Sequence, residues 1–371
     1  MVCFLIVSPI LVLYSMGDRF DFIKMKITQT GGIYVRTFPV AEQITIDSKI
    51  SKKPALFSNS IFVQSLLPNI HTVLIKKSGY YDYNKSLPVQ EEQVTKLENV
   101  ILFKKNIQFE SIADATQSPF NTQKKFIIKN NNLYYSDAPE NSGLTIAQKS
   151  TPILKKISTF TKQNNIIIWL GTDGFLYKST FNATPTAEPI KIILTPLKLV
   201  KNGTYKIIAD DKNIFINDNN ALLIFNNETK SLDNFADKIT DAKISPDGKN
   251  IVYYDNQYIY VSTVSVKPVK SIIYKSPDDI KNCVWLNNDY IIFLAGNNII
   301  ISEIDYRGNI NYITLPTTIT IHDPLASPQP QNKIPDAVIE LKNPQIFFNQ
   351  QEGKLYILNN KALIASERIL P

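Results

Sequence analysis

A recurring pair of short apolar segments constrains the fold of this 371-residue chain more than any other feature. Each copy has an apolar stretch, a polar turn containing Asn, Asp or Gly, and a second apolar or aromatic stretch, which is the pattern of a β-hairpin. The copies lie at residues 126–135, 166–177, 213–225, 250–261, 290–301 and 345–358. Their turns recur every ~44 residues, the period of a four-stranded propeller blade. We therefore predict an all-β chain in which residues 106–371 form a β-propeller of about six four-stranded blades.

The turn at residues 245–249 indicates the type of blade. Its sequence Ser-Pro-Asp-Gly-Lys places Pro246 at position i+1 of a type I turn and Gly248 at the left-handed position that follows. This turn resembles the repeats of TolB-type periplasmic propellers, and the other blades share the resemblance through their period. We expect the aromatic residues of the array to pack between blades rather than to form a sugar-stacking platform. These residues are Trp169, Tyr177, Phe215, Tyr253, Tyr260, Trp285, Phe293 and Phe347.

Residues 31–89 predict a second, smaller β-domain. Ile33 and Val35 alternate with Tyr34 and Arg36, and this period of two indicates a strand with one buried face. Further strands are expected around residues 44–46, 61–67 and 71–75. Turn-forming Asp, Ser, Pro and Asn residues separate these segments. The stretch therefore contains enough strands for one small β-domain.

The order of these strands resembles the PEGA domain, a small β-sandwich of bacterial and archaeal envelope proteins. The resemblance rests on Val35-x-Thr37-x-Pro39, Ile46-Asp47, Pro54, Pro68-Asn69-x-His71-x-Val73, and Gly79-Tyr80 with Tyr83. Residues 39–42 read Pro-Val-Ala-Glu where the family has Pro-x-Gly-Ala. The resemblance implies a PEGA-like β-sandwich over residues 27–105 that serves as a binding or spacer module. His71 is then expected to have a structural role.

The first 16 residues carry no charge. As a helix they would span about 24 Å at 1.5 Å per residue, slightly less than the roughly 30 Å hydrocarbon core of a bilayer. The basic flank and the cleavage site of a secretory signal are both missing from this segment. The positive-inside rule alone would place Arg19, Lys24 and Lys26 in the cytoplasm.

The run, followed by Tyr14-Ser15-x-Gly17-x-Arg19-Phe20-Asp21-Phe22, resembles the membrane-proximal segment of PEGA proteins from small-genome, uncultivated bacterial lineages. That resemblance implies a single-pass transmembrane helix over residues 1–22, with the bulk of the chain on the extracytoplasmic side of the cell membrane. We expect the natural anchor to begin upstream of Met1. The alternative is a helix buried in the core of the protein.

Composition argues against several functional classes. The net charge of +7 arises from 40 Lys and Arg against 33 Asp and Glu, and the basic residues are scattered. Because no basic helix or cluster of basic and aromatic residues occurs, we expect no nucleic-acid partner. Two cysteines are too few for a disulfide framework, and Cys283 is expected to be a small buried hydrophobic residue. The two histidines are isolated, so we expect no metal site and no cofactor.

Catalytic signatures are also missing from the sequence. There is no Gly-x-Ser-x-Gly elbow, no phosphate-binding loop and no His-Glu-x-x-His motif. The remaining candidates are carboxylates, at Asp173, Asp210, Asp211, Asp237, Asp241, Asp278 and Asp279. Two of them facing a channel could act as general acid and base on a glycan, but Asp in a turn is expected to bind its own backbone. The proline-rich residues 317–332 predict an exposed loop between the last two blades.

These observations favour a non-enzymatic, membrane-anchored cell-envelope protein that binds protein or glycan partners through its PEGA module and its propeller. The first alternative is a propeller glycoside hydrolase or lyase that acts on cell-surface polysaccharide. The second is an intracellular scaffold in which the N-terminal run is only a buried segment. The sequence does not assign ligand-binding residues or an oligomeric state.

Overall fold

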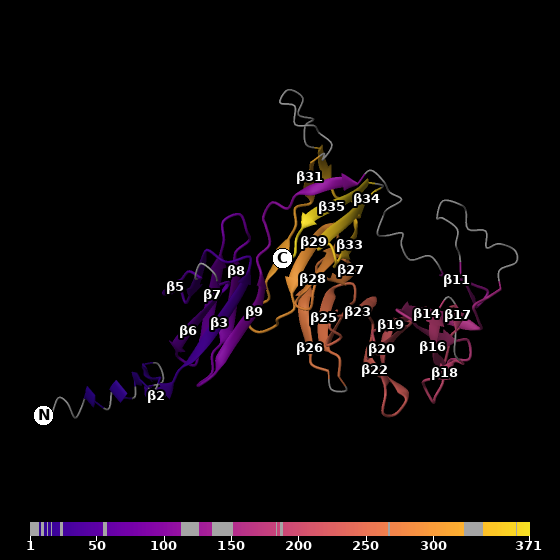
Figure 1. The fold of residues 1–371 in the computed structure, drawn as a ribbon, viewed down its shortest axis with the longest axis horizontal. Coiled ribbons are helices and arrows are strands. Elements are labelled where there is room, and N and C mark those ends of the chain that lie inside the picture. Colours follow the sequence, from indigo (N-terminus) through magenta and orange to yellow (C-terminus); the bar gives the residue numbers. More distant parts are fainter. Residues whose placement is uncertain are drawn as a thin grey trace, which may run out of the picture.

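The structure of the chain is a computed structural model in which every named element is a β-strand. It describes residues 7–8, 11–12, 14–15, 17–22, 25–54, 58–112, 126–135, 151–182, 184–185, 188–265, 268–322, 337–360 and 362–371. Figure 1 shows an N-terminal hairpin, a β-sandwich and then a row of small sheets along the long axis of the molecule. The prediction of an all-β chain is therefore confirmed.

The N-terminal segment differs from the predicted helix at its end. Residues 7–8, 11–12 and 14–15 are helical, but β1 (Asp18–Asp21) then pairs with β2 (Lys26–Gln29) in an antiparallel hairpin. The helix expected over residues 1–22 therefore cannot extend beyond Gly17, whose φ of 95° turns the chain into β1. Residues 1–6 of this prediction lie outside the described residues. In the part of the chain that the structure describes, no helix combines the length and the apolar character needed to cross a bilayer.

The sandwich consists of two sheets with a common core. One sheet has the order β6 (Ser60–Leu66), β3 (Gly31–Phe38) and β9 (Val94–Ile101). The other has the order β5 (Ile50–Lys52), β4 (Gln43–Ile46), β7 (Ile70–Lys76) and β8 (Tyr83–Pro88). Ile33 and Val35 of β3 are buried against Val73 and Ile75 of β7 in one hydrophobic cluster. The alternation predicted for this segment is thus confirmed, and β8 is an edge strand.

Five further sheets follow one another along the chain after β10 (Phe109–Ile112). The first two contain β11 (Phe126–Lys129), β12 (Asn132–Tyr135) and β13 (Leu154–Lys155), then β14 (Ile157–Gln163), β15 (Ile166–Gly171), β16 (Leu176–Asn182), β17 (Thr184–Pro185) and β18 (Ile190–Lys191). The next contains β19 (Tyr205–Ala209), β20 (Ile214–Asp218), β21 (Ala221–Asn226) and β22 (Ser231–Ala236). The last two contain β23 (Asp241–Ile244), β24 (Asn250–Tyr254), β25 (Tyr258–Thr263) and β26 (Lys270–Lys275), then β27 (Ile280–Trp285), β28 (Tyr290–Ala295), β29 (Asn298–Glu303) and β30 (Tyr312–Thr314).

The C-terminal sheet recruits a strand from the N-terminal side of the array. Its order is β32 (Ala337–Glu340), β31 (Thr318–His322), β10, β35 (Ala362–Arg368), β34 (Lys354–Asn359) and β33 (Gln345–Asn349). Strand β10 pairs with β35 in antiparallel fashion, with Phe109 opposite Ser366. The loop predicted at residues 317–332 is wrong at its start, because β31 lies parallel to β10 and buries Ile319 and Ile321. Residues 323–336 lie outside the described residues.

The turns of the predicted hairpins have the expected backbone conformation. Asn130 and Asn131 both have positive φ, as do Asn219 and Asn220, which is the geometry of a type I′ turn. Gly248 has a φ of 72° in the Ser-Pro-Asp-Gly-Lys turn, and its amide donates to the carbonyl oxygen of Ser245. The local sequence therefore predicted these reversals correctly.

Hydrophobic side chains join each sheet to the next. Representative pairs within one cluster are Leu133 with Trp169, Leu170 with Ile216, Phe215 with Tyr253, Val252 with Phe293, and Ile292 with Leu355. Strands in the middle of a sheet, such as β28, are buried on both faces because neighbouring sheets cover them. The prediction that the aromatic residues of the array pack between blades is wrong at Phe347, because β33 buries Phe348 instead.

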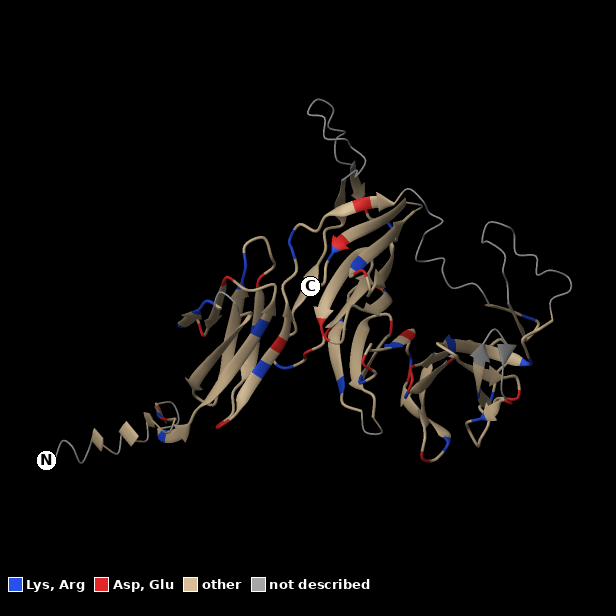
Figure 2. Cartoon of the chain, in the orientation of Figure 1, with Lys and Arg blue, Asp and Glu red and all other residues tan. Residues whose placement is uncertain are grey.

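The number of blades and the closure of a ring stay predictions. Among the described residues, no hydrophobic cluster joins the sheet of β11–β13 to the C-terminal sheet. Residues 113–125 and 136–150, which precede and interrupt that first sheet in the sequence, lie outside the described residues. Figure 2 shows Lys and Arg spread over the sandwich and the sheets, interspersed with Asp and Glu.

Candidate functional site

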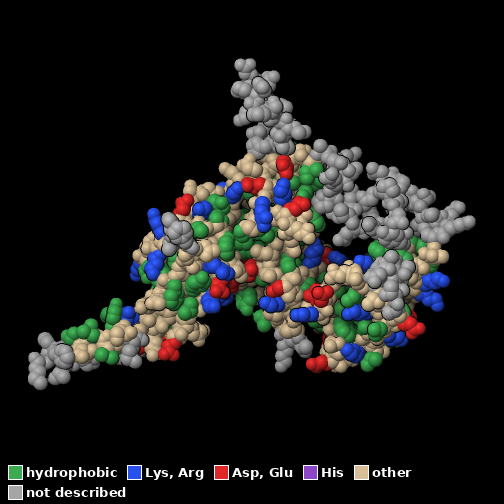
Figure 3. All heavy atoms as spheres, in the orientation of Figure 1, with side chains coloured by type: hydrophobic (Ala, Val, Ile, Leu, Met, Phe, Trp, Pro, Cys, Tyr) green, Lys and Arg blue, Asp and Glu red, His purple; other side chains and the backbone are tan. Residues whose placement is uncertain are grey.

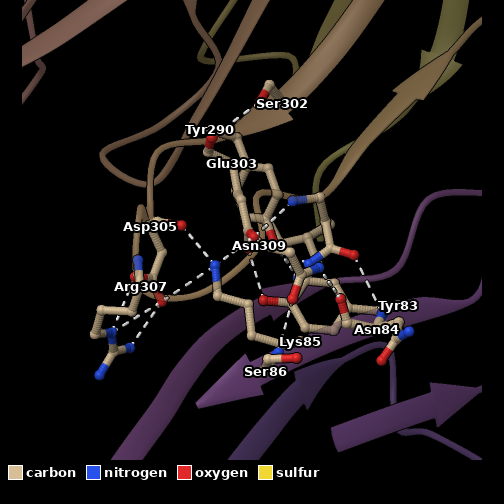
Figure 4. Close-up of polar contacts among 12 residues, drawn as sticks. Tyr83, Asn84, Lys85, Ser86, Tyr290, Ser302, Glu303, Asp305, Arg307 and Asn309 are labelled. Carbon is tan, nitrogen blue, oxygen red and sulfur yellow. Dashed lines mark hydrogen bonds and ion pairs between the residues drawn. The ribbon is translucent and has the colours of Figure 1, made fainter. Parts of the chain in front are cut away.

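A network of hydrogen bonds and ion pairs joins the sandwich to the blades at their junction. Edge strand β8 faces the loop that joins β29 to β30, and side chains of this loop cap the free backbone groups of the strand (Figure 4). The amide of Ser86 donates to Asn309 Oδ1 (2.7 Å), and the amide of Asn84 donates to Asn311 Oδ1 (3.1 Å). Asn309 Nδ2 in turn donates to the carbonyl oxygen of Asn84 (2.6 Å). The loop thus occupies an edge that would otherwise be open to another strand.

A glycine permits this close approach. Gly308 has a φ of 62°, and a Cβ added there would lie 1.9 Å from the carbonyl oxygen of Ser86. Any other residue would therefore push the loop away from β8.

A buried ion pair lies under the loop. Lys85 is 0% exposed, and its Nζ lies 2.6 Å from Glu303 Oε1 at the end of β29. The same ammonium donates to the carbonyl oxygen of Asp305 (2.5 Å). Tyr83 Oη donates to Glu303 Oε2 (2.6 Å), and the amide of Asn311 donates to Glu303 Oε1 (2.8 Å). Two buried charges are tolerated because each of them is paired and hydrogen-bonded.

The protonation states follow from burial and charge. Burial, reinforced by the negative charge of Glu303, raises the pKa of Tyr83 far above its ordinary value, so the hydroxyl stays a donor. Burial opposes ionisation of Asp305, but its hydrogen bonds from Arg307 and the charge of Lys85 outweigh that effect and lower its pKa. Arg307 Nη2 lies 2.7 Å from Asp305 Oδ2 and also donates to the carbonyl oxygen of Lys96 in β9.

Acidification is expected to weaken the junction. Because the folded pKa of Asp305 is lowered, its contribution to stability is present above its unfolded pKa of about 3.9 and is lost as the pH falls through the folded pKa. Asp289, whose pKa is raised by burial, contributes in the opposite direction. We expect the free energy of unfolding, measured by urea denaturation, to fall on acidification below about pH 4. The fall should be smaller in Asp305→Asn, and an equal fall in that variant would contradict this assignment.

Apolar contacts reinforce the junction. The chain leaving β9 enters the core of the blades, where Ile101 and Phe103 share a cluster with Leu286 and Tyr290. Tyr290 Oη accepts a hydrogen bond from the amide of Ile101 (3.1 Å), and its ring meets Phe103 edge-to-face at 5.5 Å. The segment between the two domains is therefore packed as core and does not behave as a free linker.

A cleft of about 340 Å³ opens beside the network. Its lining from the sandwich includes Lys96 and Glu98, and its lining from the blades includes Asp289, Tyr306 and Arg307. The cleft therefore carries charges of both signs from two domains. Its two aspartates have pKa values shifted in opposite directions, with Asp289 raised and Asp305 lowered.

Most of the aspartates proposed from the sequence form hydrogen bonds with nearby backbone groups or side chains. Asp173 accepts from the amide of Phe175 and from Tyr177 Oη, and Asp210 accepts from the amides of Lys212 and Asn213. The side chain of Asp237 accepts from Asn234, and that of Asp241 accepts from Lys206. The backbone carbonyl oxygen of Asp279 accepts from Gly296, and the backbone amide of Asp278 donates to Ser276. Asp211 is exposed in the same turn as Asp210.

The isolated histidine of the sandwich has structural contacts. His71 is buried, with Nδ1 2.6 Å from Asp47 Oδ2 and Nε2 2.8 Å from the carbonyl oxygen of Leu67. It joins the turn after β4 to the turn before β7, as the structural interpretation predicted. Within the described residues, no group of three or more His, Cys, Asp or Glu side chains is arranged to hold a metal ion.

Cys283 is buried, as predicted, and is expected to resist alkylation. It is 1% exposed in β27, and burial raises the pKa of its thiol to about 12. Iodoacetamide should therefore leave Cys283 unmodified in the native chain and modify it in guanidinium chloride, as read by peptide mass spectrometry. Equal rates in both conditions would contradict this prediction.

Sequence reasoning missed Lys85 and Glu303. Lys85 occupies an inward position of β8, where buried residues alternate with more exposed ones from Tyr83 to Leu87. Glu303 is buried at the end of β29, in which every residue after Asn298 is buried. A lysine at an inward position of a strand is a signal that a buried partner exists, because an unpaired buried ammonium is very costly. The identity of that partner could not be read from local periodicity.

Comparisons with known proteins add little to this description. No protein-family model matches the chain, and no curated protein matches its sequence. The structural neighbours are β-propeller proteins. Hsv2p of Kluyveromyces lactis is 11% identical with a TM-score of 0.39, over 69% of this chain and 72% of that chain. BamB of Moraxella catarrhalis is 11% identical with a TM-score of 0.36, over 81% and 82%. With TM-scores below 0.5, these similarities carry no argument about function.

Proposed function

We propose that this protein is a non-enzymatic, membrane-anchored protein of the cell envelope that binds a protein or glycan partner. In this proposal the uncharged residues 1–16 anchor the chain, residues 27–105 form a PEGA-type spacer, and residues 106–371 form a TolB-like propeller of about six blades. The bulk of the chain lies on the extracytoplasmic side of the membrane. No cofactor is required.

The observation that carries the proposal is the set of buried contacts at the junction between the sandwich and the blades. A spacer can present a binding platform at a defined distance only if it does not swing against that platform. The buried pair of Lys85 and Glu303 and the capped edge of β8 tie the sandwich to the blades. Figure 1 shows the sandwich between the N-terminal segment and the row of sheets. This is the order needed if the sandwich is a rigid arm that holds the row of sheets away from the membrane.

The pairing of β10 with β35 supports the propeller part of the proposal. In this sheet one strand, β10, comes from the beginning of the array and five come from its end, so the first strand of the array is paired with the last. This connection is what a ring of blades needs to avoid an open edge.

Two measurements test the proposal. Membranes from cells that express the full chain are washed with alkaline carbonate, and the chain should remain in the pellet. The purified chain is then incubated with cell-wall sacculi and bacterial polysaccharides, and no new reducing ends should form. Release by carbonate would contradict the anchor, and turnover of a polysaccharide would contradict the non-enzymatic assignment.

The cleft beside the junction supports a second candidate function, that of a glycoside hydrolase or lyase. Environments that shift two carboxyl pKa values apart are typical of an acid and base pair, and Asp289 and Asp305 have this property in one cleft. If the incubation above yields turnover, Asp289→Asn should abolish it while the Asp173→Asn control, which alters a turn outside the cleft, retains it. Equal turnover in both variants would exclude the cleft as the active site.

A further inference from the structure

The N-terminal hairpin of β1 and β2 has its polar face turned inward and its apolar face turned outward. The register pairs Phe20 with Ile27 and Asp21 with Lys26. Since side chains alternate along a strand, Phe20 and Ile27 share one face, and Asp21 shares the other with Thr28. A hairpin of a soluble domain normally has the opposite arrangement, with its apolar face on the core.

The inward face is tied to the sandwich by polar contacts. Asp21 and Thr28 are buried, and Thr28 Oγ1 donates to Glu91 Oε1 (2.5 Å). Lys26 Nζ lies 3.9 Å from the same carboxylate, and Arg19 Nη2 donates to Ser65 Oγ (3.3 Å). These contacts hold the hairpin in one orientation, so its outward face is a fixed feature of the surface.

Toward the turn, the outward face presents four large apolar side chains, while Asp18 and Gln29 lie on the same face at the other end of the hairpin. Phe22 is 79% exposed, Met25 72%, Ile27 56% and Phe20 42%. Phe20 and Phe22 meet edge-to-face at 5.0 Å. Figure 3 shows hydrophobic side chains gathered at this end of the molecule. Exposed apolar side chains that lie together, and not singly, indicate an interaction surface.

The apolar face continues into the N-terminal segment. The large apolar residues described in that segment are also exposed, namely Val7, Leu11, Val12 and Tyr14. Tyr14 is linked to the hairpin through Arg19, whose guanidinium lies 3.5 Å from the centre of the tyrosine ring and donates to its carbonyl oxygen. An uncharged run joined to a hairpin with exposed aromatic side chains and flanking Arg and Lys has the composition found at a membrane interface.

We infer that the outward face of this hairpin, formed by Phe20, Phe22, Met25 and Ile27, lies in the interfacial region of a lipid bilayer. This inference rests on the proposed function, in which the preceding residues anchor the chain. The hairpin then adds a second, rigid contact beside the anchor, and its polar attachment to the sandwich sets the tilt of the arm on the membrane. Arg19 and Lys26, on the opposite side of the hairpin, remain at headgroup level.

The test uses the full chain in phosphatidylcholine vesicles, with and without lipids brominated along their acyl chains. Phe22→Trp introduces a fluorophore on the hairpin, and Met25→Trp is a second variant on the same face. Tyr306→Trp is the matched control, because Tyr306 is an exposed aromatic residue of the blades. The native tryptophans, Trp169 and Trp285, are both buried and provide a constant background.

On vesicle binding, the emission of Trp at positions 22 and 25 should shift to the blue, be quenched by the brominated lipid and be protected from aqueous acrylamide. The control should show none of these changes. Flotation with the vesicles while both hairpin positions stay accessible to acrylamide would overturn this inference alone. Failure to float would overturn both this inference and the proposed anchor. A blue shift without lipid that grows with protein concentration would show that a second copy covers the face, which also overturns the inference.

Discussion

The Lys85→Met variant is expected to have a free energy of unfolding about 3–5 kcal/mol lower than the unaltered chain. Methionine keeps most of the volume of the side chain but removes the ammonium, which leaves the carboxylate of Glu303 buried without its cation. Tyr83 and Asn311 still donate to that carboxylate, but they do not neutralise its charge. Urea denaturation followed by far-ultraviolet circular dichroism measures the effect.

Two further variants make this test specific. Lys76→Met removes a lysine from the neighbouring strand β7, where its pair with Asp82 is about half exposed, so a loss of only ~0–1 kcal/mol is expected. Adding Glu303→Gln to Lys85→Met removes the unpaired charge while keeping an acceptor for Tyr83, and much of the lost stability should return. Equal effects of Lys85→Met and Lys76→Met would show that the buried pair does not hold the junction.

The Gly308→Ala variant is expected to separate the loop from β8. A Cβ at this position would lie 1.9 Å from the carbonyl oxygen of Ser86, so the loop must move and the hydrogen bonds of Asn309 must lengthen or break. The added clash should cost about 1–3 kcal/mol, beyond the roughly 1–2 kcal/mol of a left-handed conformation for a residue with a Cβ. Small-angle X-ray scattering should show a larger radius of gyration as the sandwich swings away.

Gly79→Ala is the matched control for this change. Gly79 also has a positive φ, of 79°, but a Cβ there would meet nothing within 4 Å. The control therefore carries the same backbone strain without the clash, and its radius of gyration should not change. If both variants scatter alike, contact between Gly308 and β8 does not determine how the domains are placed.

Both predictions concern a region that the sequence describes only in part. The PEGA resemblance reaches Tyr83 but predicts no strand around Lys85, and the structure places Tyr83, Lys85 and Leu87 on one face of β8. Nothing in the alternation of this strand distinguishes a lysine that reaches solvent along the surface from one that is fully buried. The partner lies 218 residues away in the chain, in a strand that reads locally as an ordinary apolar segment.

The sequence-based predictions for residues 18–21 and 318–322 were wrong for a related reason. Residues 18–21 were assigned to a helix because the preceding run is apolar, but their backbone groups pair with β2. Residues 318–322 were assigned to a loop because prolines follow them, but β10 offers an open edge with which they pair. In each case a partner strand supplied hydrogen bonds that local composition does not reveal.

By itself, the sequence determined the all-β class, the series of hairpins and the conformation of their turns. These features depend on contiguous residues, since the period of two selects the buried face and Asn or Gly supplies the positive φ. Only the tertiary structure decided that β10 joins β35, that Lys85 meets Glu303, and that the hairpin of β1 and β2 turns its apolar face outward. These features depend on contacts between strand edges and between buried charges that come from different parts of the fold. The free energy of such contacts depends on tertiary geometry, which a local sequence pattern does not determine.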